Sequence, residues 1–271
     1  MKYYLYNKLA NNGIKLDLPN GAEPIDCVGV DYEKFFNELK PEDEVVLVGG
    51  DGTLNHLVNY VDCSKIKNNI YLLANGTGND FMNDIEEPLD KEALINKYLV
   101  DLPVVKVKGR EYKYLNNMSF GLDGYCCEEA DIIKEKRPNK KINYALIAIK
   151  GLLFDFKPKH AWIEVDGKSY EYDDVWLAPA MHGRYVGGGM KMAPNQSRSS
   201  DHLSLVIYHG RNKLKALIAF PSIFKGEHIK YTDMVEVIEG HKIHVKYDSP
   251  CAVQIDGDCI LDVIEYWAEK N

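Results

Sequence analysis

The sequence predicts an α/β domain followed by a mostly antiparallel β domain. In residues 1–102, short apolar runs alternate with helix-like segments, which is typical of a parallel sheet with crossover helices. In residues 103–271, short strand-like runs are separated by turn pairs such as Lys108-Gly109 and Asp166-Gly167. No repeat or low-complexity linker separates the two parts, so we expect them to pack directly around a ligand-binding cleft, with the C-terminal segment as a candidate to return to the first domain.

Hydrophobic periodicity and turn residues predict the individual elements. The first domain is expected to contain strands at residues 2–6, 25–30, 44–48 and 70–74, and helices at residues 31–39, 53–61 and 90–99. The second domain is expected to contain strands at residues 104–108, 161–165, 175–180, 203–208, 243–247 and 252–255.

Length and composition indicate an ordinary globular chain. Its 271 residues are 45% hydrophobic and 27% charged. The first residues lack the apolar stretch of a signal peptide, and no run approaches the roughly 20 apolar residues of a membrane span, so we expect a cytoplasmic protein. The six cysteines lack C-x-x-C spacing, which argues against a zinc site and a disulfide framework. The net charge of -8 argues against a nucleic-acid partner.

A glycine-rich loop follows a predicted buried strand. Residues 44–48 lead directly into Gly49, Gly50, Asp51 and Gly52, and Thr53 is the expected N-cap of the next helix. Glycines let backbone amides approach a phosphate closely, and the helix N-terminus favours the anion. Asp51 could hold a magnesium ion or accept a proton. The competing interpretation is a plain turn from strand to helix, in which glycine serves only the backbone conformation.

Two further loops follow predicted strands in the same way. Residues 70–74 run into Asn75-Gly76-Thr77-Gly78-Asn79-Asp80-Phe81, and residues 2–6 run into residues 7–13. Ligands of open α/β sheets bind at the carboxyl ends of the strands, so we expect these loops to clasp one nucleotide. Neither the Walker pattern nor G-x-G-x-x-G occurs in them.

Together the loops resemble those of the soluble diacylglycerol kinase and sphingosine kinase-like lipid kinases, whose catalytic domain carries a G-G-D-G-T loop and a later G-T-x-N-D-F loop. The resemblance extends through residues 116–123 and 253–258 and so covers nearly the whole chain. It implies an N-terminal Rossmann-like α/β nucleotide-binding domain, a C-terminal antiparallel β-sandwich domain, and ATP with Mg²⁺. The implied reaction is transfer of the γ-phosphoryl group to a lipid hydroxyl, most directly diacylglycerol to phosphatidic acid.

The resemblance also implies binding residues. Lys8 replaces the usual proline of the first loop and Asn11 its glycine, while His56 stands where many members have glutamate and is interpreted as structural. Where the family often has an aspartate pair for a structural magnesium in the second domain, this chain has Ser199 and Ser200, which leaves Asp201 as the metal candidate. The nucleotide-binding candidates are Asn7, Lys8, Leu9, Ala10, Gly49, Gly50, Asp51, Gly52, Thr53, Leu54, Asn55, Gly76, Thr77, Asn79 and Asp80.

Phosphoryl transfer to a hydroxyl also needs a group that takes the proton. The family usually has D-G-E near the C-terminus with the glutamate in that role, and this chain has Asp256-Gly257-Asp258. By this resemblance Asp258 is the predicted general base, while Asp51 organises magnesium and the phosphates. The competing interpretation of Asp256-Gly257 is an ordinary type I′ hairpin turn.

A basic cluster and several apolar runs bear on the acceptor. Residues 134–141 are rich in lysine and arginine and precede the apolar residues 142–156, which fits either an anionic bilayer surface or a solvated turn before a packed helix. Residues 142–154 and 216–224 could shape an acyl-chain pocket or belong to the core, and the loop 182–190 could border the lipid site. We expect a lipid substrate and peripheral association with the inner face of the membrane. Formation of a homodimer is left open.

Two alternatives stay open. NAD kinases also use a G-G-D-G-T loop, although they are understood to present an N-E pair where this chain has residues 76–81. A catalytically weak lipid-binding protein would explain the departures at Lys8, Asn11, His56, Ser199 and Ser200. Phosphorylation of NAD would support the first alternative. Vesicle binding without magnesium-dependent ATP consumption would support the second.

Overall fold

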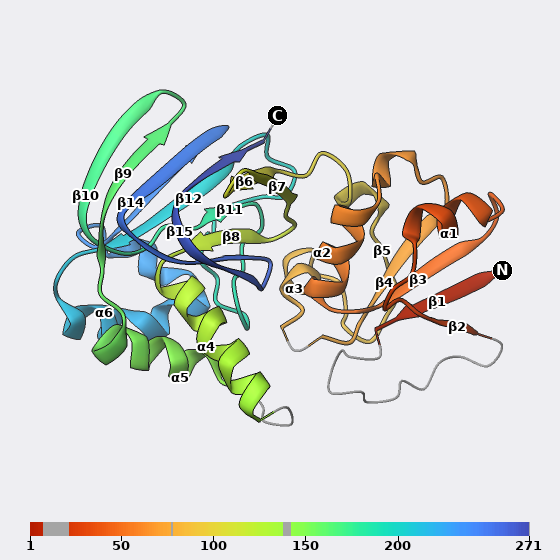
Figure 1. The fold of residues 1–271 in the computed structure, drawn as a ribbon, viewed down its shortest axis with the longest axis horizontal. Coiled ribbons are helices and arrows are strands. Elements are labelled where there is room, and N and C mark those ends of the chain that lie inside the picture. Colours follow the sequence, from red (N-terminus) through yellow and green to blue (C-terminus); the bar gives the residue numbers. More distant parts are fainter. Residues whose placement is uncertain (8–21, 77, 138–141, 271) are drawn as a thin grey trace. The chain divides into compact units, whose positions relative to one another are not determined.

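The computed structural model describes residues 1–7, 22–76, 78–137 and 142–270. Contacts divide the chain into two compact units, Met1–Leu102 and Pro103–Asn271, which we call the N-terminal and C-terminal units (Figure 1). The N-terminal unit is of the α/β type and the C-terminal unit is rich in β-strands. No helix in the described ranges combines the length and the apolar character needed to cross a membrane.

The N-terminal unit contains a five-stranded sheet in the order β2-β1-β3-β4-β5. Strands β1 to β4 run parallel, and β5 pairs antiparallel at the edge. The strands are β1 (Lys2–Tyr6), β2 (Glu23–Asp26), β3 (Glu44–Gly49), β4 (Asn69–Ala74) and β5 (Ala93–Leu94). The helices are α1 (Tyr32–Glu38), α2 (Asp51–Tyr60), α3 (Asp80–Asp84) and the short 3-10 turns η2 (Cys63–Lys65) and η3 (Asn96–Tyr98).

Apolar runs and caps explain the central elements of this sheet. Strand β3 is buried along almost its whole length, as expected for a parallel strand that is covered on both faces. Helix α2 turns Leu54, Leu57 and Val58 into the core. Helix α1 starts after Asp31, whose carboxylate accepts the Lys34 N–H at 3.1 Å and so caps the first turn.

Two predictions for this unit were wrong in part. The expected helix at residues 90–99 is instead the edge strand β5 followed by η3. Without this segment, the backbone N–H and C=O groups along the edge of β4 would lack partners. The segment pairs with them: the Ile95 N–H donates to Ile70 O at 2.9 Å, and Asn96 Oδ1 accepts the Ile70 N–H at 2.7 Å. The strand expected at residues 25–30 lies earlier, as β2, because the chain turns at Gly29 (φ +83°).

The C-terminal unit is built on one continuous antiparallel sheet. Its main path is β7-β6-β15-β14-β8-β11-β12-β10-β9, with β13 paired to β12 and a further pairing between β9 and β14 that returns the sheet on itself. The strands are β6 (Val104–Val107), β7 (Arg110–Lys113), β8 (Asn117–Phe120), β9 (Lys159–Val165), β10 (Lys168–Leu177), β11 (Ala180–Met181), β12 (Leu203–His209), β13 (Val235–Gly240), β14 (Lys242–Ile255) and β15 (Asp258–Glu269).

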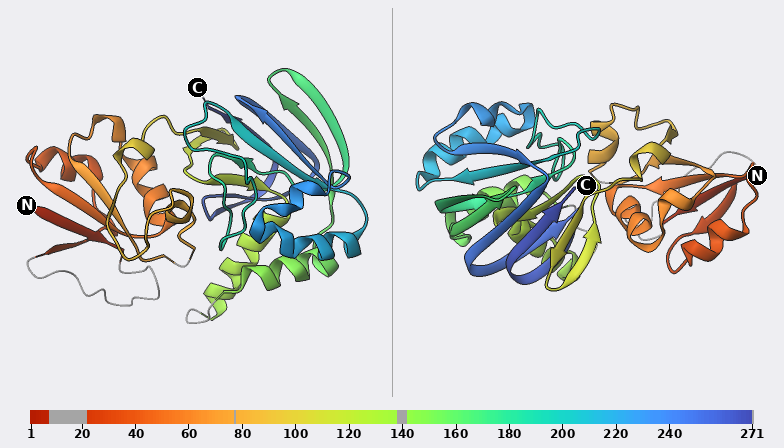
Figure 2. Two further views of the ribbon diagram at one scale, coloured as in Figure 1. Left: turned by 180° about the vertical axis from the view of Figure 1, so that it is seen from behind. Right: turned by 90° about the horizontal axis from the view of Figure 1, so that it is seen from above.

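Helices gather on one side of this sheet (Figures 1 and 2). They are α4 (Leu122–Lys136), α5 (Tyr144–Lys150), the π-helical turn η4 (Gly151–Asp155), α6 (Lys213–Ala219) and the 3-10 turns η5 (Phe220–Lys225) and η6 (Glu227–Lys230). Gly124 lets α4 approach β14 closely, because a Cβ there would overlap the backbone of Ala252. A second apolar core therefore forms between sheet and helices, separate from the core inside the sheet.

Two strand predictions for this unit need correction. The run at residues 175–180 is divided between β10 and β11, because Pro179 has no N–H to donate and lies between them. The runs at residues 243–247 and 252–255 belong to the single strand β14, whose pairing with β15 shifts register between Lys246 and Val253.

Candidate functional site

The two glycine loops of the N-terminal unit lie against each other. The Asn75 N–H donates to Gly49 O at 2.7 Å, which joins the ends of β3 and β4. A Cβ on Gly50 would lie 2.7 Å from the Cα of Gly76, and a Cβ on Gly76 would lie 2.6 Å from the Cα of Gly50. Real Cβ atoms do not approach other atoms so closely, so both positions require glycine. The structure thus brings together two loops that are separated by a helix in the sequence.

Asp51 connects these loops through its carboxylate. Its Oδ2 accepts the Asp80 N–H at 3.0 Å, and its Oδ1 accepts the Phe81 N–H at 2.9 Å. The first residue of α2 therefore caps the N-terminus of α3, where backbone N–H groups lack partners within the helix. Asp51 has a structural function in the loop pair whatever further ligand it holds.

Asn79 closes the second loop. It lies in the left-handed region at φ +52°, which asparagine tolerates better than most residues. Its amide accepts the Gly76 N–H and donates to Gly76 O, both at 3.0 Å. Asp80 is buried at the start of α3. Among the other candidates, Thr77, Lys8, Leu9 and Ala10 lie outside the described residues, and Asn7 directly follows β1.

The expected N-cap at Thr53 was wrong. Helix α2 begins at Asp51, and its N-cap is Gly50 in an extended conformation, whose carbonyl accepts the N–H groups of Thr53 at 3.0 Å and Leu54 at 3.2 Å. The Thr53 side chain is buried against Gly49. Gly52 is different, because a Cβ there would meet no atom within 4 Å. The first turn of this ten-residue helix is open at Gly52, where a phosphate could approach.

The remaining candidates on α2 have mainly structural contacts. Leu54 is fully buried in the core, and Asn55 accepts two hydrogen bonds from the Asn59 amide, at 3.0 Å and 3.2 Å. The His56 ring stacks on Tyr60 with centroids 4.3 Å apart and packs edge-on against Tyr32. The interpretation of His56 as a structural residue agrees with these contacts.

In the C-terminal unit, Asp256 and Gly257 form the hairpin turn between β14 and β15. Both have positive φ, +46° and +97°, as a type I′ turn requires, so the turn interpretation is confirmed. The buried Asp256 carboxylate accepts three successive backbone N–H groups, from Leu115 at 2.5 Å, Asn116 at 2.8 Å and Asn117 at 3.1 Å. Asp256 therefore fixes the turn to the segment that enters β8. Asp258 follows as the first residue of β15 and is exposed.

Gln254 connects this turn to the start of α4. Its Oε1 accepts the Gly257 N–H at 2.8 Å, and its Nε2 donates to Asp123 Oδ2 at 2.8 Å and to Asn117 Oδ1. Burial raises the pKa of Asp123 above its ordinary value, against the opposing effect of hydrogen bonds from Gln254 and Ser119. Gln254 thus connects the carboxyl group of Asp123, whose pKa is raised, to the turn that precedes Asp258.

Asp123 lies on the wall of an apolar pocket within the C-terminal unit. The cavity inside it has a volume of about 60 Å³. Among the described lining residues Asp123 alone carries a carboxylate. The expected apolar runs at residues 142–154 and 216–224 and the loop 182–190 all contribute to this one pocket. The lining residues are Leu122, Asp123, Cys126, Tyr144, Ala148, Leu152, Trp176, Leu177, Val186, Gly187, Met190, Met192, Tyr208, Ala216, Phe220 and Ile223.

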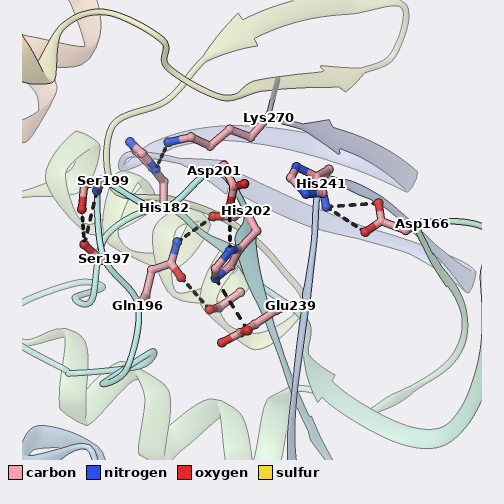
Figure 3. A network of polar contacts seen from close by, with 11 residues as sticks. Asp166, His182, Gln196, Ser197, Ser199, Asp201, His202, Glu239, His241 and Lys270 are labelled. Carbon is pink, nitrogen blue, oxygen red and sulfur yellow. Dashed lines mark hydrogen bonds and ion pairs between the residues drawn. The ribbon is translucent and has the colours of Figure 1, made fainter.

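The surroundings of Asp201 do not fit the metal site for which it was a candidate. Its carboxylate contacts Nδ1 of His202 at 3.1 Å, and His202 Nε2 lies 3.6 Å from Glu239 (Figure 3). The Ser197 and Ser199 hydroxyls hydrogen-bond each other at 2.8 Å nearby. Across the described ranges, no three His, Cys, Asp or Glu side chains are grouped so that they could hold a metal. The second carboxylate of this group, Glu239, is connected to Asp201 through the His202 ring.

Sequence reasoning missed Asp123 and Gln254 as site residues. Both lie inside stretches that carried the family resemblance, but their spacing of about 130 residues gave no sign that they meet. An acidic residue in the first turn of a helix that follows Gly121 (φ +108°) was the available signal. Such a residue is usually explained by its favourable interaction with the helix dipole, so the sequence alone did not single out Asp123.

Comparison with known proteins finds relatives for both units. Residues 5–106 match the family model of the diacylglycerol kinase catalytic domain, and residues 116–264 match that of the YegS C-terminal NAD kinase beta sandwich-like domain. A diacylglycerol kinase of Mycobacterium tuberculosis (strain CDC 1551 / Oshkosh) is 25% identical over 264 residues, which cover 93% of this chain and 83% of that protein. A crystal structure of a diacylglycerol kinase from Bacillus anthracis (strain Sterne) shares the fold, with a TM-score of 0.67 and 20% identity over 99% of this chain and 93% of that one.

The glycine contact predicts different outcomes for two similar substitutions. Gly50→Ala is expected to destabilise the N-terminal unit by about 1–3 kcal/mol, because the added methyl group overlaps the Gly76 backbone. Gly52→Ala adds the same group in open space within a helix and should leave stability equal or up to about 1 kcal/mol higher. Hydrogen exchange of the α2 amides measures both. Equal protection in the two variants would contradict the described contact.

Proposed function

Because this chain belongs to the diacylglycerol kinase family of lipid kinases, with a YegS-type C-terminal domain, it is a phosphotransferase, and we propose that it transfers the γ-phosphoryl group of ATP to the hydroxyl of diacylglycerol. The observation that carries the choice of a lipid acceptor is the apolar pocket of the C-terminal unit, which contains one carboxylate and is connected through Gln254 to the turn before Asp258. Pockets of this kind combine apolar walls with a few polar groups that orient the ligand.

The N-terminal unit supplies the nucleotide site in this proposal. Backbone amides at the start of a helix bind phosphate well, and the open side of α2 at Gly52 leaves room for it. The contact between Gly50 and Gly76 and the capping by Asp51 hold the two loops in one arrangement before the nucleotide binds. A preformed site of this kind supports phosphoryl transfer, which depends mainly on positioning and electrostatic stabilisation.

The first glycine loop offers one carboxylate, Asp51, to the proposed magnesium ion. In phosphoryl-transfer sites Mg²⁺ is usually held by one or two carboxylates together with substrate phosphates and water. Asp51 is the carboxylate that joins the two loops, and its carboxylate oxygens would hold the ion. The ion would neutralise the phosphate charge.

Asp258 is the proposed general base. It takes the proton of the lipid hydroxyl as that oxygen forms a bond to the γ-phosphorus, and the bond from the γ-phosphorus to the β,γ-bridging oxygen breaks to release ADP. Two features support Asp258 over Asp256: Asp258 is exposed, and the Asp256 carboxylate already accepts three backbone N–H groups. The acyl chains would occupy the apolar pocket, with Asp123 accepting a hydrogen bond from the glycerol headgroup.

A radiolabelled-ATP panel tests the proposed function. The acceptors are diacylglycerol, monoacylglycerol, ceramide, sphingosine and undecaprenol in mixed micelles, with NAD as the acceptor of the alternative kinase class. Magnesium-dependent labelling of diacylglycerol is the expected result. Labelling of NAD alone would establish the alternative kinase. Absence of labelling of every acceptor, with vesicle binding retained, would establish the lipid-binding alternative.

The D-G-D turn predicts a contrast between its two aspartates. Asp258→Asn should reduce turnover by about 10²–10⁴-fold with unfolding unchanged, whereas Asp258→Glu should retain most activity because it keeps a carboxylate. Asp256→Asn is the matched control and should lower stability by about 1–3 kcal/mol, because an amide cannot accept all three backbone N–H groups. Turnover and urea unfolding measure the three variants. Undiminished turnover of folded Asp258→Asn would remove Asp258 from the mechanism.

The raised pKa of Asp123 predicts that replacing its carboxyl group keeps or increases stability but weakens substrate binding. The pKa of Asp123 in the folded state lies above the unfolded value of about 3.9, so the folded protein binds the proton more tightly. The free energy of unfolding therefore falls as pH rises through the folded-state pKa. Asp123→Asn should therefore be at least as stable as the wild type at pH 7, and the difference should vanish below about pH 4. Its apparent KM for diacylglycerol should rise about tenfold. A variant that is less stable at pH 7 with unchanged KM would indicate a purely structural carboxylate.

A further inference from the structure

The helices that border the apolar pocket also carry large apolar side chains into solvent. Five of these side chains are exposed: Leu146 by 63%, Phe154 by 77%, Leu214 by 67%, Ile218 by 65% and Phe224 by 44%. They come from two segments of the C-terminal unit, α5 with η4 and α6 with η5. Single exposed apolar residues are normal on protein surfaces, but a group of this size in neighbouring helices marks an interaction surface.

The two segments are held together. Lys213, at the start of α6, donates to the carbonyl of Leu153 in η4 at 2.9 Å. Figure 1 and the view from behind in Figure 2 show α5 and α6 on the same side of the sheet. Leu214 and Ile218 are four residues apart and therefore lie on one face of α6, while Ala216 and Ala219 are buried. We call the exposed parts of residues 144–157 and 213–225 the helical face.

The buried side of the same helices forms part of the pocket wall. Ala148 and Leu152 contribute from α5 and η4, and Ala216, Phe220 and Ile223 contribute from α6 and η5. One layer of helix therefore separates the exposed apolar side chains from the apolar pocket. A ligand that resides in a bilayer would have a short path between the two.

The charge of the helical face differs in sign from that of the whole chain. Its two segments contain five lysines, Lys150, Lys157, Lys213, Lys215 and Lys225, and one acidic residue, Asp155, whereas the chain carries a net charge of -8. Lys150 contacts Asp155 at 2.7 Å and Glu129 of α4 at 3.6 Å, and Lys215 pairs with Asp233, so two of the five lysines have acidic partners. Lys157 and Lys225 are exposed. Apolar side chains surrounded by lysines complement an anionic bilayer surface.

We propose that the helical face docks the C-terminal unit on an anionic lipid bilayer, with the five apolar side chains at the level of the headgroups and the lysines beside the lipid phosphates. This inference rests on the proposed function, because the ligand of the adjacent pocket is then a bilayer lipid. The charges argue against a second copy of this chain as the occupant, since a two-fold contact would bring the same lysines together. Peripheral docking of this kind uses apolar contact and electrostatic attraction together.

The test is sedimentation with vesicles of phosphatidylcholine, with and without phosphatidylglycerol. The docking variant is Phe154→Ser with Leu214→Ser and Ile218→Ser. The matched control is Leu261→Ser with Ile264→Ser, which removes apolar side chains exposed by 47% and 46% on β15 of the same unit. Wild type and control should bind the anionic vesicles, and the docking variant should partition at least tenfold less. Lys157→Glu with Lys225→Glu should remove the preference for phosphatidylglycerol.

A second measurement separates docking from catalysis. With a short-chain diacylglycerol dispersed as monomers, the docking variant should match the wild type, because only the interfacial step is removed. With vesicle-borne diacylglycerol, its apparent KM should rise about tenfold at unchanged turnover on the monomer. If no lipid is phosphorylated but the variant still loses vesicle binding, the proposed function fails and docking stands.

Three outcomes would overturn docking through this face. One is equal vesicle binding by wild type and the docking variant. Another is a wild type that phosphorylates monomeric diacylglycerol but does not bind anionic vesicles. The third is a wild-type dimer, seen by light scattering, that dissociates in the docking variant, because the face would then be an interface between two copies.

Discussion

The backbones of Gly50 and Gly76 lie so close that no side chain fits between them, and the arrangement of the N-terminal unit at this edge depends on that contact. It brings the ends of β3 and β4 together and allows Asp51 to reach the first N–H groups of α3. Gly50 and Gly76 are therefore required by the fold. They let the loops approach each other, and at Gly52 the absence of a side chain leaves the start of α2 open to a ligand.

The C-terminal unit uses a carboxylate in the same way. Asp256, like Asp51, accepts successive backbone N–H groups of a segment remote in the sequence, and each removes the cost of leaving those groups unpaired. In both motifs the acidic residue beside glycine is needed for the architecture before any chemistry is considered. This division explains why the proposed proton acceptor is the exposed Asp258, while Asp256 holds the preceding turn through hydrogen bonds.

Local chemistry made much of the fold predictable. Parallel strands buried on both faces read as continuous apolar runs, as in β3, and the pairs Lys108-Gly109, Asp166-Gly167 and Asp256-Gly257 adopt the positive φ values that their hairpins require. The segment at residues 90–99 was not predictable from its helical pattern, because the unpaired edge of β4 decides its conformation. Thr53 has good capping chemistry, but the extended Gly50 starts the helix earlier.

The helices beside the apolar pocket show why apolar patterns alone could not separate core from exposed surface. Helices α5 and α6 have apolar residues on both sides, since one side lines the pocket and the other faces solvent. A helix that is apolar all round is normally interpreted as fully buried. Here the tertiary structure buries only the side of each helix that lines the pocket. Core packing therefore does not account for the apolar side chains on the exposed side. The lysines between the exposed residues are the sequence feature that distinguishes this case, because a helix surrounded by core would bury their charge at high cost.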